Sequence, residues 1–139
     1  MLKRIAFTTF ALAAFTAAPG LAQTVKTVLP NQTSPTSGKE MFNEYCAVCH
    51  GRDGKGSGPA ASALKKTPTD LTRLVVQNNG KFPDGRVARH IEGYERVSAH
   101  GSLDMPTWGT VFKSMNGSDE IVRMRISNLT EYIKSLQAK

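Results

Sequence analysis

A chain of 139 residues is long enough for one domain with a modest hydrophobic core. Its 18 lysines and arginines outnumber its 11 aspartates and glutamates, which gives a formal charge of +7. The basic residues are scattered along the sequence and form no single stripe, so nucleic acid is not an expected partner. The charge instead favours association with proteins that present acidic docking faces.

Residues 1–22 have the pattern of a cleaved secretory signal peptide. Lys3 and Arg4 precede an apolar run that ends near Ala18, and small residues follow at the expected cleavage site. The run is shorter than the roughly 20 residues that span a bilayer, which disfavours the alternative of an uncleaved anchor. The signal peptide predicts export to the periplasm. No later segment is apolar enough to cross a membrane, so we expect no transmembrane segment in the mature chain. After cleavage 16 basic and 11 acidic side chains remain, a charge of +5.

Residues 23–36 are polar, rich in threonine and interrupted by prolines, a composition typical of a flexible lead-in. The remaining residues, 37–139, are expected to form the main domain. Its first helix should begin near Ser37, a candidate N-cap with Glu40 three residues later. Apolar side chains at helical spacing follow and should face the core, and the helix should lead directly to Cys46.

The run Cys46-Ala-Val-Cys49-His50 is the attachment motif of c-type haem. Two thiols three residues apart can bond to the two vinyl groups on one edge of the porphyrin, and the next histidine can then coordinate the iron. A zinc site would need more ligands, and the chain has no other cysteine. A thioredoxin-like dithiol would need a βαβ pattern, which is absent. We therefore predict one haem c bound through Cys46 and Cys49, with His50 as an iron ligand and no disulfide.

Residues 51–59 are expected to be a glycine-rich loop that ends at Pro59. Glycines at these positions permit positive φ angles and a close approach of the backbone to a flat ligand. A ligating histidine needs an acceptor for its other ring nitrogen, so a carbonyl group of this loop could hold His50.

The rest of the chain is predicted to be helical, because strand-like alternation is nearly absent. A short helix is expected over 60–65, and a second is expected after a cap at Thr69 or Asp70, ending at 78–80. A third should run from Phe82-Pro83-Asp84 to Gly93, and residues 98–110 should be irregular. The last helix should follow a Ser118 cap. Its apolar stripe consists of Val122, Ile126, Leu129, Ile133 and Leu136.

Met105 is the preferred second iron ligand, because it lies in the irregular stretch and Pro106 stiffens the backbone behind it. His100 in the same stretch and an open sixth position are the alternatives. Four other candidates are better explained by packing: Met41, His90, Met115 and Met124. With His50 and Met105 both bound to the iron, no position remains for a substrate, and this favours electron transfer over catalysis.

Taken together, these motifs resemble the class I, monohaem c-type cytochromes of the bacterial periplasmic type, over roughly residues 37–137. The resemblance is carried by the run from Cys46 to Pro59, by Pro68-Thr-Asp-Leu-Thr72 and by Met105-Pro-Thr-Trp-Gly109. It implies an all-α cytochrome c fold, with about four to five helices wrapped around one covalently attached haem.

The resemblance also implies details of this fold. The N- and C-terminal helices should cross near Gly38 and Phe42, against Leu129 and Tyr132, and a glycine at the crossing would permit close approach. The Pro59 carbonyl should accept a hydrogen bond from His50. Trp108 should pack near the haem.

The leading functional hypothesis is periplasmic electron transfer by a monomer that is not an enzyme and that docks on acidic faces of redox partner proteins. The first alternative is a cytochrome subunit of a periplasmic dehydrogenase complex. The remoter alternative is a haem-based sensor or a peroxidase-like enzyme, which would require an open sixth position in place of Met105.

Overall fold

The computed structural model describes residues 30–94, 105–115 and 117–138, and within these ranges it contains helices and no strand. This confirms the predicted all-α class. The elements are α1 (Gly38–Met41), a π-helical turn η1 (Phe42–Cys46), α2 (Ala47–His50), the 3-10 turns η2 (Ala61–Ala63) and η3 (Leu71–Arg73), α3 (Leu74–Gln77), α4 (Asp84–Glu92), α5 (Trp108–Ser114) and α6 (Asp119–Ser135). Contiguous elements join, so α1, η1 and α2 form one helical segment.

The first and last helices begin where the sequence places their caps. The Ser37 hydroxyl accepts a hydrogen bond from the Glu40 amide at 3.2 Å, and the Ser118 hydroxyl accepts one from the Ile121 amide at 3.3 Å. Each cap satisfies a backbone N–H that has no partner inside its helix. The expected starts of both helices are thus confirmed.

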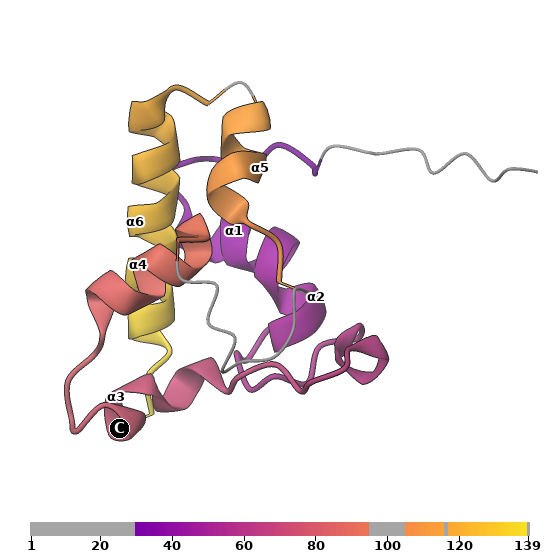
Figure 1. Ribbon diagram of the computed structural model, residues 1–139, viewed down its shortest axis with the longest axis vertical. Helices are drawn as coiled ribbons and strands as arrows, with labels where there is room; N and C mark the ends of the chain where they lie inside the picture. Colours follow the sequence, from indigo (N-terminus) through magenta and orange to yellow (C-terminus); the bar gives the residue numbers. More distant parts are fainter. Residues whose placement is uncertain (1–29, 95–104, 116, 139) are drawn as a thin grey trace, which may run out of the picture.

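Helices α1 and α6 cross in direct backbone contact (Figure 1). A Cβ atom built on Gly38 would lie 2.1 Å from the carbonyl oxygen of Asn128, so only glycine fits at this point. Beside the crossing, the rings of Phe42 and Tyr132 pack with centroids 5.2 Å apart. The crossing and the need for a glycine there are both as the resemblance implied.

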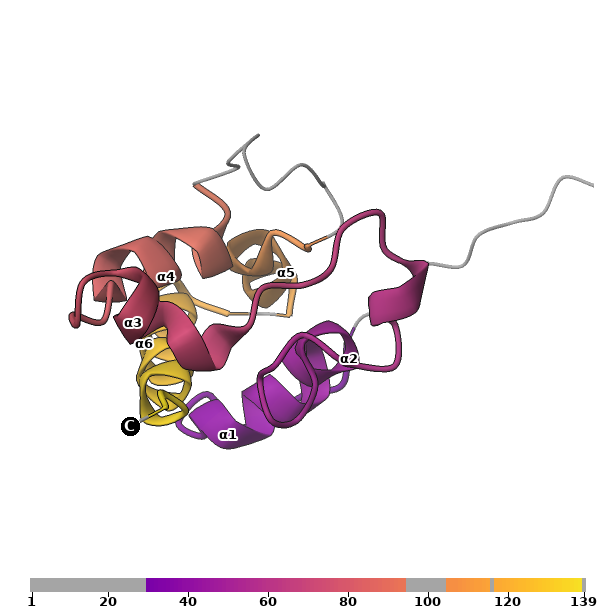
Figure 2. The same ribbon diagram turned by 90° about the horizontal axis from the view of Figure 1, so that it is seen from below.

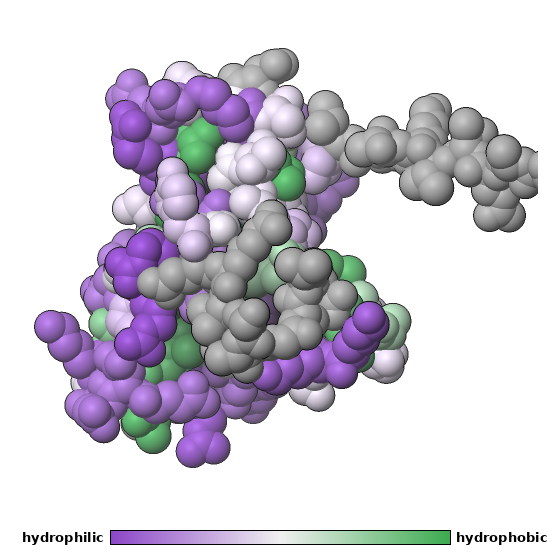
Figure 3. All heavy atoms as spheres, viewed as in Figure 1, coloured by the Kyte–Doolittle hydropathy of each residue, from purple (hydrophilic) through white to green (hydrophobic). Residues whose placement is uncertain are grey.

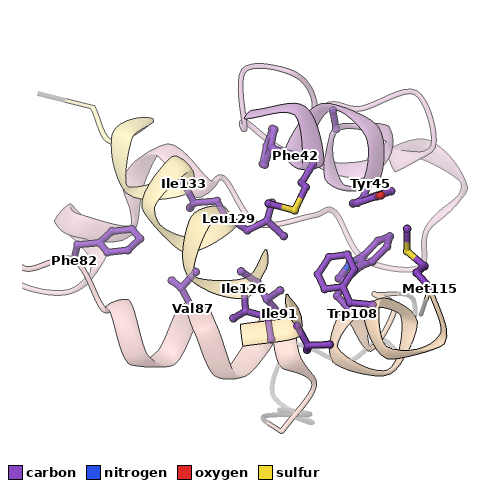
Figure 4. Close-up of a cluster of buried hydrophobic side chains, with 14 residues drawn as sticks. Phe42, Tyr45, Phe82, Val87, Ile91, Trp108, Met115, Ile126, Leu129 and Ile133 are labelled. Carbon is purple, nitrogen blue, oxygen red and sulfur yellow. The ribbon is translucent and has the colours of Figure 1, made fainter. Parts of the chain in front are cut away.

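The hydrophobic core lies between α6 and the helices around it (Figure 4). Four residues of the α6 stripe are buried, and its last member, Leu136, packs against the core from a half-buried position. The stripe meets Met41 and Phe42 of the first segment, Val87 and Ile91 of α4, and Phe112 of α5. Figure 2 shows the first segment and the α4–α5 pair on opposite sides of the molecule, with the chain that leads to α3 running between them.

The prediction of irregular structure over 98–110 is wrong at its C-terminal end, because α5 already begins at Trp108. Residues 98–104 lie outside the described part of the chain. The helix starts here because Trp108 and Phe112, one turn apart, both enter the core. Gly109 serves helix packing, since a Cβ there would lie 2.7 Å from the carbonyl oxygen of Glu92. Packing against α4 thus stabilises the helix at Gly109, although a glycine by itself favours a loop.

The end of the expected flexible lead-in is held against the domain. Thr33 is 9% exposed, and it is hydrogen-bonded to Arg125 of α6 and to Tyr45 of the first segment. In Figure 1 this indigo segment runs behind α5 and α6 before it turns into α1. Residues 23–29 lie outside the described part of the chain, so only residues 30–36 depart from that expectation.

The end of α6 fixes the turn that precedes α3. The Gln137 side chain donates a hydrogen bond to the Leu71 carbonyl at 2.7 Å and accepts one from the Val75 amide at 3.0 Å. Asp70 caps this turn by accepting from the Thr72 amide at 2.9 Å, as predicted. These contacts hold the segment after Pro68 in place, next to the loop that follows His50.

The surface seen in Figure 3 is mainly hydrophilic, and its apolar residues form small separate patches, one of them on the side of the molecule where α2 lies. Among the described residues, no helix is both long and apolar enough to cross a membrane.

Candidate haem-binding site

The two cysteines lie one helical turn apart at the junction of η1 and α2, and both are free and partly exposed. Burial, together with the neighbouring Cys49 thiol, raises the pKa of Cys46 to about 12. Among the described residues, no group of three or more His, Cys, Asp or Glu side chains could hold a metal ion.

His50 ends α2, and a backbone carbonyl fixes its imidazole ring. Its Nδ1 lies 3.1 Å from the carbonyl oxygen of Thr69, which can only accept, so Nδ1 carries the proton. The other nitrogen, Nε2, then keeps a lone pair for a metal ion. Burial lowers the pKa of His50, and the hydrogen bond to Thr69 opposes that shift. The ring is thus held in the neutral form that an iron ligand requires.

Thr69 replaces Pro59 as the acceptor, so the prediction that the Pro59 carbonyl holds His50 is wrong. The loop after His50 folds back onto α2 through two amides, Gly56 to the His50 carbonyl at 2.7 Å and Gly58 to the Cys49 carbonyl at 3.0 Å. The loop carbonyls are therefore not the groups that reach the imidazole. The chain after Pro68 crosses behind the loop and presents the Thr69 carbonyl to the ring.

Glycine is required where these two stretches of backbone meet. Gly56 has a φ angle of +84°, and a Cβ built on it would lie 2.3 Å from the Pro68 carbonyl oxygen. A Cβ on Gly58 would lie 2.5 Å from the carbonyl oxygens of Ala47 and Val48 in α2. A side chain on Gly56 would push the segment of Pro68 and Thr69 away from the loop, and a side chain on Gly58 would push the loop away from α2.

Met105 lies just before α5, and its side chain is 45% exposed. Met41 and Met115 are buried at 0% and 6% exposure, which agrees with their assignment as packing residues. The Met105 side chain is thus not packed in the hydrophobic core. His100 lies outside the described residues.

Trp108 links the Met105 segment to the attachment motif. Its ring is 8% exposed and stacks on Tyr45, with centroids 5.2 Å apart and planes inclined by 30°. Tyr45 directly precedes Cys46 and Trp108 opens α5, so the pair, whose two side chains are drawn in Figure 4, connects the attachment motif with the start of α5. The sequence singled out Trp108 but missed its partner, because Tyr45 reads as one more apolar position on a helix face.

The chemistry of these groups fits a covalently bound haem. Two free thiols, an imidazole with an available Nε2 and an unburied thioether are the donors that such a group needs. The exposed apolar side chain of Val48, between the cysteines, and that of Met105 are surfaces that an apolar ring could cover. Sequence reasoning missed Thr69 as the acceptor, and no signal distinguishes its carbonyl from those of its neighbours.

Comparison with known proteins agrees with this chemistry. Residues 33–133 match the family described as cytochrome C oxidase, cbb3-type, subunit III. The chain is also 34% identical over 62 residues to the cytochrome subunit of sulfide dehydrogenase from Chlorobaculum tepidum. That alignment covers 44% of this chain and 56% of the relative, so the chain spans only about half of the relative's length. No solved structure gives a significant match. Because the family match extends over most of the chain, the protein belongs to this cytochrome c family and is a class I c-type cytochrome.

Proposed function

We propose that the protein is an exported electron carrier in which Cys46 and Cys49 hold one haem c and His50 and Met105 bind its iron. The observation that carries this proposal is the 3.1 Å contact from His50 Nδ1 to the Thr69 carbonyl, beside two free thiols. That contact leaves Nε2 as the ligating atom. The bound haem supplies an iron that can gain and lose one electron. The chain holds the group covalently, so it is not lost by dilution outside the cytoplasm.

The two proposed ligands would affect the iron in different ways. The Thr69 carbonyl orients the His50 ring and makes its Nε2 more basic. The thioether of Met105 is neutral and soft, and it therefore favours the reduced iron and raises the reduction potential. With His50 and Met105 both bound to the iron, no position would remain for a substrate, so the protein would act as a carrier and not as an enzyme.

The test is an optical spectrum of the exported protein, oxidised and reduced, with carbon monoxide added to the reduced sample. We expect a low-spin c-type spectrum with the weak methionine–iron(III) charge-transfer band, unchanged by carbon monoxide. Met105→Ala should lose that band and bind carbon monoxide. Met124→Ala is the matched control, because its half-buried side chain lies on α6, and it should keep the band. An exported protein without covalently bound haem would refute the proposal.

Exposed cations next to the site suggest how the carrier meets its partners. Arg52 and Lys55 lie on the loop after His50, and Lys65 follows η2; all three side chains are exposed. An acidic face on a redox partner would be attracted to this cluster, and the attraction is screened by salt. Association rates should therefore fall steeply between low and physiological ionic strength. A flat salt profile would argue against electrostatic docking.

The second candidate is a permanent cytochrome subunit of a periplasmic dehydrogenase complex. It is favoured by the relative from Chlorobaculum tepidum, which is named as the cytochrome subunit of a sulfide dehydrogenase. Purification from the native cells at physiological salt distinguishes the two candidates. A free carrier elutes alone as a monomer, whereas a subunit elutes with a larger partner chain.

A further inference from the structure

Arg125 is a buried cation on α6, close to the aromatic pair that borders the candidate site. Its side chain is 5% exposed, and among the described residues no carboxylate forms an ion pair with it. Its guanidinium donates from Nη1 to the Thr33 hydroxyl at 2.9 Å and from Nη2 to the Thr33 carbonyl at 2.8 Å. It also lies over the Phe112 ring, 5.5 Å from the centroid. A buried charge is costly, and these three contacts offset the cost.

The hydrogen bonds that start at Arg125 have one possible direction. A guanidinium can only donate, so the Thr33 oxygen accepts from it. The Tyr45 hydroxyl donates its single proton to the Asn31 carbonyl at 2.6 Å. The 2.8 Å contact between the Thr33 and Tyr45 hydroxyls must then use the Thr33 proton. The chain runs from Arg125 through Thr33 and Tyr45 to Asn31, and each bond polarises the next.

This chain of hydrogen bonds passes through the hydroxyl of Tyr45, whose ring stacks against Trp108. Trp108 lies three residues after Met105, and its ring is 5.6 Å from that of Phe112, which Arg125 covers. The five side chains of Arg125, Thr33, Tyr45, Trp108 and Phe112 therefore form a closed circuit. The circuit connects the residue before Cys46 with the residue that opens α5.

We propose that Arg125 is a positioning residue for the iron ligand Met105. Through Thr33 it fixes the Tyr45 ring, which in turn holds Trp108 and the start of α5 in the place from which Met105 reaches the iron. The proposal rests on the proposed His50/Met105 ligation. It also gives residues 31–33 a function, because Arg125, which lies 92 positions after Thr33, holds this segment against α6.

The test measures how readily added imidazole displaces Met105 from the oxidised iron. The apparent affinity of imidazole rises with the fraction of molecules in which the methionine has left the iron. Thr33→Val removes the relay hydroxyl, and Tyr45→Phe keeps the ring but loses its hydrogen bonds. Both should bind imidazole at least about threefold more tightly, and Arg125→Gln about tenfold, because a hydrogen bond to a charged group is worth roughly that factor.

Two controls separate positioning from general loss of stability. Thr130→Val removes another buried hydroxyl of α6, one that bonds only to the Ile126 carbonyl, so it should lower stability in urea and leave the imidazole affinity unchanged. Arg125→Lys keeps the charge but loses the planar fork that reaches both Thr33 oxygens, so its imidazole affinity should lie between those of the wild type and Arg125→Gln. The charge-transfer band should weaken in the same order as imidazole binding strengthens.

The outcomes are distinct. Wild-type imidazole affinity in both Thr33→Val and Tyr45→Phe would overturn the proposal, even if Arg125→Gln fails to fold. An equal rise in the Thr130→Val control would also overturn it, because the effect would then be one of stability. A wild-type protein with covalent haem but no methionine–iron band would instead refute Met105 ligation itself, and the inference with it.

Discussion

Replacing Gly38 with alanine should push the first and last helices apart. In an open helical position, alanine is favoured over glycine by up to about 1 kcal/mol. At Gly38 the new Cβ would lie 2.1 Å from the Asn128 carbonyl oxygen and 2.9 Å from the Tyr132 Cβ. These are backbone and helix-fixed atoms, so the helices themselves must move. Overpacking of this kind costs about 1–3 kcal/mol, and the steric cost therefore exceeds the gain in helix propensity.

The matched control for this substitution is Gly85→Ala in α4. A Cβ at Gly85 meets only the end of the flexible Arg89 side chain, at 3.4 Å, so alanine should be neutral or stabilising by up to about 1 kcal/mol. Urea unfolding of both variants gives the comparison, with a net loss of about 1–2 kcal/mol expected for Gly38→Ala. Equal stability of the two variants would show that the helix crossing has room for a side chain.

Three further substitutions test other parts of the structure. Asp70→Ala should cost about 1 kcal/mol of stability, because it removes the cap on the Thr72 amide. The hydrogen bond from the Thr72 side chain lowers the pKa of Asp70 in the folded protein. The stability from the cap is therefore full above the unfolded-state pKa of about 4, and it is lost as the pH falls through the lower folded-state pKa. Asp70→Asn should keep the cap and show less of this acid sensitivity. Leu129→Ala, at a side chain with 0% exposure, should cost about 2–5 kcal/mol in urea unfolding, and a loss below 1 kcal/mol would mean that the core collapses around the site. Lys134→Met breaks the exposed ion pair with Asp84 and should leave the urea midpoint unchanged within error, since such pairs contribute little.

Local patterns in the sequence were sufficient for the starts of the first and last helices and for the attachment motif. Ser37 and Ser118 act on amides three residues away, so their effect needs no knowledge of the fold. The stripe on α6 follows from helical periodicity alone, and burial of Leu129 confirms it. The spacing of Cys46, Cys49 and His50 is equally local, because a single helical turn brings the three side chains together.

Contacts between distant segments decided the rest. Which carbonyl meets His50 depends on how the chain after Pro68 crosses the loop, and backbone carbonyls carry no sequence label, so Thr69 could not be told from Pro59. The helical start at Trp108 depends on packing against α4, which outweighs the glycine that follows it. The composition around Thr33 predicts a polar lead-in, and its hydrogen bond to Arg125 could not be foreseen because the two residues lie 92 positions apart in the sequence. The sequence alone therefore predicted most of the helices and the candidate ligands, because both follow from local spacing, whereas tertiary packing determined the start of α5 and the groups that hold the site in place.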